Sequence, residues 1–215
     1  MMNSRKEIRR LSKDELPPGA QMLSREEALN MLWKRINNHP KRMEVWPFTY
    51  GLGLLSAASI VPGIIYTNKV RNTFKLRGFG TLITYGPCVV VPAMFVVLGQ
   101  TIAVTNKLVL GEFTCTSCAQ VRSAVTQLSV GWAWPGMLTP MLCFMVARKY
   151  NPTALPALKN FGDLGRFLWK IYRPSKGILG FSFVLQTLAA AFVIDQQLTA
   201  NVKLNEEDRT LVKVR

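Results

Sequence analysis

Four long stretches of the chain contain no Asp, Glu, Lys, Arg or His, and every charged residue lies in the loops and tails around them. The stretches are residues 46–68, 78–106, 123–147 and 177–194. About 20 apolar residues of helix cross the hydrocarbon core of a bilayer, and one charged residue at the centre of such a helix costs about 2.5–3.5 kcal/mol. The pattern therefore predicts an all-α, four-transmembrane-helix integral membrane protein, with helices near residues 46–67, 79–106, 123–147 and 177–194.

The four predicted helices form one membrane domain, residues 46–194. An N-terminal tail, residues 1–45, precedes this domain and mixes basic with acidic side chains. A polar C-terminal tail, residues 195–215, follows it and is balanced in charge. We expect the C-terminal tail to extend the last transmembrane helix before it frays.

Two further segments have the spacing of amphipathic helices. Ser24 and Glu27 have capping-box spacing, and apolar residues then recur on one face, so we expect a helix at residues 24–37. This helix lies either in the membrane interface or against the protein or a partner. Apolar residues between positions 158 and 172 recur at helical spacing among cations, and they predict a second, basic interfacial helix.

The formal net charge is +15, which in a soluble protein would indicate nucleic-acid binding. Here the cations concentrate in two loops, residues 69–77 and 148–176, whereas the loop 107–122 holds two cations and one acid. Basic loops resist translocation and attract anionic headgroups, so we expect both on the inner face, with the termini and loop 107–122 opposite. The residues expected to bind membrane lipid or a partner, and not nucleic acid, are Lys69, Arg71, Lys75, Arg77, Arg148, Lys149, Arg166, Lys170 and Arg173.

Small residues and one amide indicate where helices pack together. Gly51, Gly53, Ser56 and Ala57 give the first transmembrane helix a thin face that lets another helix approach closely. Gln186 is an amide inside the last apolar stretch, and such amides usually form hydrogen bonds across a helix interface. We therefore expect Gln186 to be a packing residue and not a substrate ligand.

The motif with the most distinctive chemistry is Cys115-Thr-Ser-Cys118, in the loop before the third apolar stretch. A C-x-x-C pair at a helix start can be a redox couple, half of a zinc site that lacks its other ligands, or a structural disulfide that closes a turn. The position opposite the basic loops favours an oxidising compartment, and we weight the structural disulfide or plain thiols above the other two readings.

Signatures of enzymes and cofactor sites are missing elsewhere. The sequence has no G-x-x-x-x-G-K-[ST], H-E-x-x-H or G-x-S-x-G pattern. Proton relays and ion-coupled pumps place charged groups at mid-membrane, and the four stretches contain none. We therefore expect no catalytic residues, no metal and no cofactor, and a protein that acts by binding other membrane helices and surfaces.

Several short motifs together resemble one known family. In order they are Cys115-Thr-Ser-Cys118, Arg122-Ser123, Gly131, Pro135, Ala147-Arg148, Tyr150, Ala154-Leu155-Pro156 and Leu185-Gln186-Thr187. They resemble the transmembrane protein 126 family, over roughly the second half of the chain.

That resemblance implies a mitochondrial inner-membrane assembly factor for respiratory complex I, and not an enzyme. It implies as partners the membrane-arm subunits of complex I and other assembly factors, with the basic loops in the matrix and the Cys115/Cys118 loop in the intermembrane space. Membrane lipid, cardiolipin included, is a further expected partner of the basic loops. The competing hypotheses are a permanent structural subunit of a respiratory complex and a membrane thiol oxidoreductase that uses Cys115 and Cys118.

Overall fold

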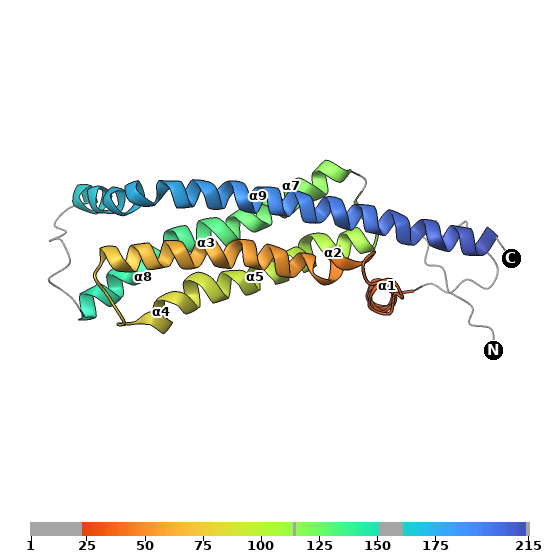
Figure 1. Ribbon diagram of the computed structural model, residues 1–215, viewed down its shortest axis with the longest axis horizontal. Helices are drawn as coiled ribbons and strands as arrows, with labels where there is room; N and C mark the ends of the chain where they lie inside the picture. Colours follow the sequence, from red (N-terminus) through yellow and green to blue (C-terminus); the bar gives the residue numbers. More distant parts are fainter. Residues whose placement is uncertain (1–22, 114, 151–160, 214–215) are drawn as a thin grey trace.

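The computed structural model describes residues 23–113, 115–150 and 161–213, and the regular secondary structure in these ranges is helical. Four of its helical segments are long and apolar enough to cross a membrane: Gly51–Thr73, Thr81–Val109, Thr116–Tyr150 and Gly165–Leu204. They pack side by side into an elongated bundle (Figure 1). The predicted all-α fold with four transmembrane helices is therefore confirmed.

The first transmembrane segment begins with a short helix, α2 (Trp46–Thr49), followed at once by α3 (Gly51–Thr73). We expected this segment to end near residue 67, where the charges begin, but α3 continues to Thr73 and includes Lys69 and Arg71. The first charge marks the edge of the apolar layer and not the end of the helix. The backbone of a long basic residue can stay helical while the charged end of its side chain reaches the interface.

The second and third transmembrane segments alternate between α-helix and wider π-helical turns. The second consists of α4 (Thr81–Tyr85), η2 (Gly86–Val90), α5 (Val91–Gln100), η3 (Thr101–Thr105) and α6 (Asn106–Val109). The third consists of α7 (Thr116–Thr126), η4 (Gln127–Ala133) and α8 (Trp134–Tyr150). Each π segment bends its helix and changes which side chains face the neighbouring helices.

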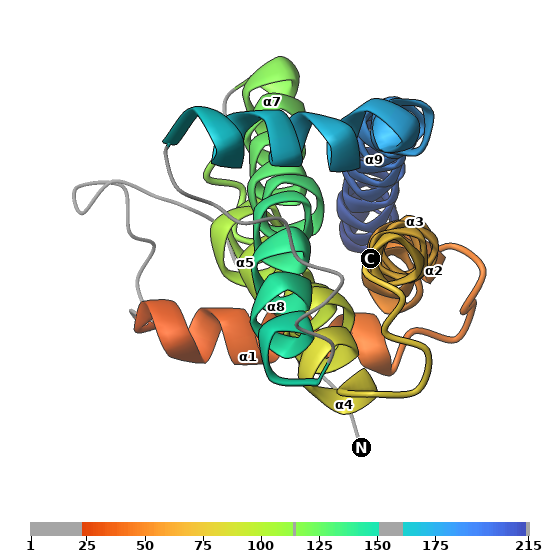
Figure 2. The same cartoon turned by 90° about the vertical axis from the view of Figure 1, so that its left-hand side faces the viewer.

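The fourth segment belongs to a single helix, α9 (Phe161–Lys213), that is 53 residues long. We expected a separate interfacial helix at 158–172 and a span at 177–194; instead one helix covers both, and residues 151–160 lie outside the described part of the chain. The first part of α9 lies across the bundle and the rest runs along it (Figure 2). Pro174 lies inside α9, and because it lacks an N–H group it accounts for a bend without ending the helix.

The amphipathic helix α1 (Arg25–Asn37) packs across one end of the bundle (Figure 2). Its Ser24–Glu27 capping box is formed as the sequence predicts. The Trp33 indole donates a hydrogen bond to Asn106 Oδ1 at 3.1 Å, and Ile36 joins a buried cluster with Phe48 and Leu108. The apolar face of α1 is therefore directed at the protein itself.

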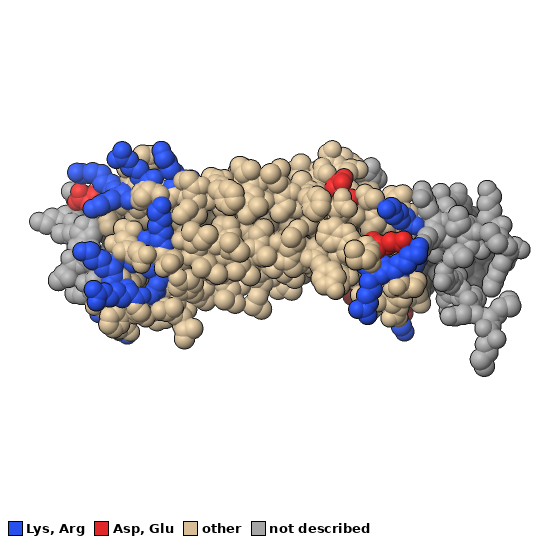
Figure 3. Space-filling model, viewed as in Figure 1, with Lys and Arg blue, Asp and Glu red and all other residues tan. Residues whose placement is uncertain are grey.

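On the face that Figure 3 shows, charged side chains lie at the two ends of the bundle and the middle carries none, as the four uncharged stretches of the sequence require. The α3–α4 loop, the end of α8 and the start of α9 lie at the end opposite α1 (Figure 1), and we call this the basic end. The bundle has the layout of a membrane protein, with a central band that carries no charge between two polar caps.

Candidate functional site

The basic end brings together the cations that the sequence placed in two loops. Eight of the nine predicted residues keep at least part of their side chain accessible there: Lys69, Lys75, Arg77, Arg148, Lys149, Arg166, Lys170 and Arg173. Among the described residues, Asp163 is the acidic residue at this end, and it forms an ion pair with Arg166 at 3.2 Å. The basic end therefore has a large excess of positive charge at the edge of the apolar band.

Arg71 differs from its predicted role, because it is 3% exposed and not at the surface. Its guanidinium donates five hydrogen bonds, all to neutral oxygens; they are the carbonyls of Arg77, Phe79 and Gly80 and the hydroxyls of Thr81 and Thr84. The bonds come from Nη1 and Nη2, whose four N–H groups are shared among the five acceptors, and one side chain in this way organises the whole α3–α4 loop. Arg71 is therefore a buried residue that holds the α3–α4 loop together.

Four glutamines form a polar seam through the bundle, and each is at most 1% exposed. Each Nε2 donates to a backbone carbonyl of another element: Gln100 to Ser123 at 2.8 Å, Gln127 to Leu55 at 2.9 Å, Gln186 to Gly131 at 3.0 Å and Gln197 to Pro47 at 3.1 Å. The Oε1 atom of each glutamine has no hydrogen-bond partner. The seam is therefore built from neutral groups and joins all four transmembrane segments.

Sequence reasoning identified Gln186 but missed Gln100, Gln127 and Gln197. Gln100 and Gln127 lie inside uncharged stretches as Gln186 does, so the argument that an amide in a membrane helix seeks a partner applied to them equally. Gln197 lies beyond the predicted end of the fourth span, and it becomes a core residue because α9 continues past that end.

Two prolines in the third segment leave backbone carbonyls without their α-helical donors, and side chains of other helices donate to those carbonyls. Pro135 and Pro140 have no N–H group, so the carbonyls four residues earlier, at Gly131 and Gly136, lack their α-helical donor. Gly131 O accepts from Gln186 Nε2 at 3.0 Å and from Ser59 Oγ at 3.3 Å. Gly136 O accepts from the Tyr66 hydroxyl at 3.2 Å and the Tyr172 hydroxyl at 2.9 Å. Neighbouring helices thus supply the donors that the prolines remove.

The thin face predicted on the first segment is divided between the inside and the outside of the bundle. Gly51 is buried, and a Cβ atom there would lie 2.9 Å from Val193 Cγ1 of α9. Gly53 and Ala57 are exposed, and a Cβ added at Gly53 would meet nothing within 4 Å. Ser56 is half-buried on a third side. The chain therefore uses Gly51 for its own packing, while Gly53 and Ala57 face outward.

Cys115 and Cys118 lie at the start of α7 as two free, exposed thiols. Cys115 is the N-cap residue, and its Sγ accepts a hydrogen bond from the Cys118 backbone N–H at 3.2 Å. A hydrogen bond from the Cys118 thiol, followed by those from the backbone N–H groups of Cys118 and Ser117, lowers the pKa of the Cys115 thiol. In this structure the two thiols are free, and the Cys115 sulfur caps the start of α7.

No group of three His, Cys, Asp or Glu side chains in the described part of the chain is close enough to hold a metal ion. Cys88 and Cys143 are buried within the bundle.

Three outward-facing methionines form a stripe on α8 that was not predicted from the sequence. Met137, Met141 and Met145 repeat every four residues, and their exposed fractions are 74%, 61% and 57%. Next to the stripe, Trp134 of α8 packs against Phe95 of α5 with ring centroids 6.5 Å apart. The i, i+4, i+8 spacing was the available signal, and flexible methionines suit a surface that adapts to different partners.

Comparison with known proteins places these features in a family. The family model for Transmembrane protein 126 matches residues 26–210. The chain is 34% identical over 199 residues to Transmembrane protein 126 of Drosophila melanogaster, which covers 92% of this chain and 89% of that protein. It is 27% identical over 107 residues to the mitochondrial Complex I assembly factor TMEM126B of Mus musculus, covering 50% of this chain and 46% of that protein. No solved structure matches the chain significantly. These matches, together with four helices long and apolar enough to cross a membrane, show that the chain belongs to the transmembrane protein 126 family.

Proposed function

We propose that the protein is a non-enzymatic scaffold that holds a partly built membrane-arm module of respiratory complex I in the mitochondrial inner membrane. The observation that carries this proposal is the similarity to the mouse complex I assembly factor, which covers half of the chain. The uncharged band and the neutral polar seam support it, because they suit a protein that binds helices and does not move ions.

The methionine stripe and the outward small residues are the surfaces that suit an incoming membrane subunit. Association of helices in lipid depends on close packing, since apolar side chains gain little by leaving lipid tails. Gly53 and Ala57 allow a partner backbone to approach α3 closely, and Met137, Met141 and Met145 can repack around different side chains. Other assembly factors would bind these surfaces or the cations of the basic end.

The test of this function is deletion of the protein followed by native-gel analysis of complex I. The expected result is a stalled membrane-arm subassembly and less mature complex. A photo-crosslinking amino acid at Met141 should then capture a membrane-arm subunit, whereas the same probe at Leu188, which is 64% exposed on α9, serves as the control. Normal amounts of mature complex and no stalled subassembly would overturn the proposal. Stoichiometric presence in the finished enzyme would instead indicate a permanent structural subunit.

The proposed orientation has the basic end in the matrix, with α1 and the Cys115/Cys118 loop in the intermembrane space. The excess of Lys and Arg at the basic end supports this orientation. A membrane-impermeant maleimide added to mitochondria whose outer membrane has been opened should label Cys115 and Cys118. Labelling that requires the inner membrane to be opened as well would reverse the orientation.

A membrane thiol oxidoreductase is the second candidate function, and the two exposed thiols with a lowered Cys115 pKa favour it. It predicts that a Cys115→Ser, Cys118→Ser double variant inserts normally but loses all function. Normal complex I assembly by this variant would eliminate the oxidoreductase.

A further inference from the structure

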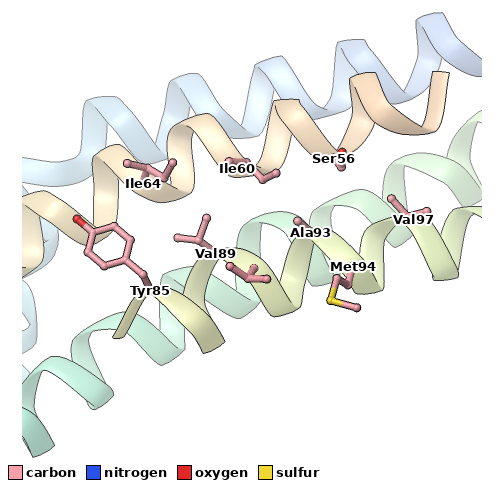
Figure 4. Close-up of a pocket in the computed structure, with 9 residues that line it drawn as sticks. Ser56, Ile60, Ile64, Tyr85, Val89, Ala93, Met94 and Val97 are labelled. Carbon is pink, nitrogen blue, oxygen red and sulfur yellow. The ribbon is translucent and has the colours of Figure 1, made fainter. Parts of the chain in front are cut away.

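A groove opens on the side of the bundle between α3 and the second transmembrane segment. Its volume is about 470 Å³. One wall is the stripe Ser56, Ile60 and Ile64 of α3, and the other runs from Tyr85 to Val97 through Val89, Ala93 and Met94 (Figure 4). Apart from the Ser56 and Tyr85 hydroxyl groups, the lining side chains are apolar. The π-helical turn η2, which contains Pro87, lies in this stretch and bends the helix beside the groove.

We propose that this groove binds one acyl chain of an anionic phospholipid whose headgroup contacts Lys75 and Arg77 at the basic end. The proposal goes beyond the assembly role and holds whether or not the protein serves complex I.

The dimensions of the groove favour an acyl chain over a helix of a partner protein. From Tyr85 to Val97 the helix rises about 18 Å, at about 1.5 Å per residue. This length is close to the depth of one leaflet, about 15 Å or half of the hydrocarbon core. A helix about 10 Å wide would occupy about 1,400 Å³ over the same length, roughly three times the volume of the groove.

The charge at one end of the groove favours an anionic headgroup. Tyr85 stands at the end nearest the α3–α4 loop, and the Arg71 guanidinium lies 5.6 Å from its ring centroid. All five hydrogen bonds of Arg71 go to neutral oxygens, so its positive charge is not neutralised by them. Lys75 and Arg77 are exposed in that loop. Both have a left-handed backbone, with φ of 51° and 44°, and Arg71 donates a hydrogen bond to the Arg77 carbonyl. A phosphate at this level would meet several cations at the depth where headgroups lie.

The test uses the full chain in phosphatidylcholine vesicles that contain a trace of phospholipid with a photoactivatable group on its acyl chain. Two probes differ only in the headgroup, phosphatidylglycerol or phosphatidylcholine, and the labelled residues are mapped by mass spectrometry. We expect the anionic probe to label Ile60, Ala93 and Met94 more strongly than the neutral probe does.

Two sets of variants separate the acyl chain from the headgroup. Ala93→Phe fills the groove from α5 and should reduce the labelling several-fold, and Ser56→Leu fills it from α3 in case Ala93→Phe does not fold. Leu188→Phe, on an exposed position of α9, is the size control and should change nothing. Arg77→Gln and Lys75→Gln should each lower the preference for the anionic probe by about fivefold. Lys170→Gln is the charge control, since the first part of α9 lies on the far side of the basic end from α4 (Figure 2).

Three results would overturn the proposal. The first is labelling spread evenly over lipid-facing positions such as Leu188, as expected for bulk lipid. The second is an equal yield from both headgroups in the unaltered protein. The third is capture of a polypeptide by a photo-crosslinking amino acid at Ile60 in native membranes, which would assign the groove to a partner helix.

Discussion

The side-chain amide of Gln186 in α9 donates a hydrogen bond to the carbonyl of Gly131 at 3.0 Å, and that carbonyl lacks its α-helical donor because Pro135 stands four residues later. The two residues are 55 positions apart in the sequence. One helix thus supplies the hydrogen-bond donor that a proline removes from another. This bond couples the packing of α9 to the irregular course of the third segment.

Replacing Gln186 with Leu should weaken the bundle. The variant loses the hydrogen bonds to Gly131 O and Ser182 Oγ, and we expect the free energy of unfolding to fall by about 0.6–1.7 kcal/mol. The measurement is an SDS titration in mixed micelles followed by circular dichroism. Thr187→Val is the matched control, because Thr187 bonds to Phe183 O within its own helix. Equal stability of the two variants would contradict a structural role for the seam.

Gly51 and Gly53 are two residues apart and should respond oppositely to alanine. A Cβ at Gly51 would lie 2.9 Å from Val193 Cγ1, whereas one at Gly53 has open space. Overpacking should cost Gly51→Ala about 1–3 kcal/mol, and Gly53→Ala should gain about 0.5–1 kcal/mol because glycine is a poor helix residue. The same SDS titration checks both. If Gly51→Ala were the more stable variant, the contact between α3 and α9 would be wrong.

Loss of Arg71 should loosen the α3–α4 loop. Arg71→Gln removes the positive charge and most of the five hydrogen bonds. This leaves part-buried carbonyls and the buried Thr84 hydroxyl without this donor, and we expect a loss of about 3 kcal/mol. Arg71→Lys should recover only part of this, since lysine has three donors and no planar fork. The local readout is the rate of trypsin cleavage after Arg77, with the exposed Arg148→Gln as control. An unchanged cleavage rate in Arg71→Gln would show that the loop holds its shape without the guanidinium.

The thiol of Cys115 should react at a lower pH than an ordinary cysteine. The hydrogen bond from the Cys118 thiol is the largest cause of its lowered pKa, so Cys118→Ala should raise that pKa and move the midpoint of the alkylation rate to higher pH. The measurement is the rate of iodoacetamide labelling of Cys115 against pH. Labelling of Cys88 and Cys143, which are buried, should stay slow throughout. A midpoint that does not move in Cys118→Ala would remove this interaction as the cause.

Much of the fold follows from the distribution of charge. The uncharged stretches located all four membrane helices, because burying a charge in lipid costs more than any local preference of the chain. They did not locate the helix ends: α3 passes beyond Lys69 and Arg71, and α9 passes through Pro174. The charged residues indicate where the apolar layer ends, whereas a helix can continue beyond that layer into water.

The inward position of Arg71 could not be read from the sequence. Its charge indicates exposure, and its burial depends on the carbonyls of residues 77–80, which converge on it only after the loop has turned. The acceptors at Gly131 and Gly136 could have been predicted from the sequence, since proline always removes the donor for the carbonyl four residues earlier. The π-helical form of η2, η3 and η4 depends on packing around the whole bundle, which no single residue specifies.

The uncharged middle of the bundle has a consequence for its behaviour in an energised membrane. Moving one elementary charge through a potential of about 100 mV changes its energy by about 2.3 kcal/mol. The seam of glutamine amides holds the helices together without any such charge, so helices that slide or part within this band perform almost no electrical work. Rearrangements of these helices should therefore proceed with equal ease at high and at collapsed voltage.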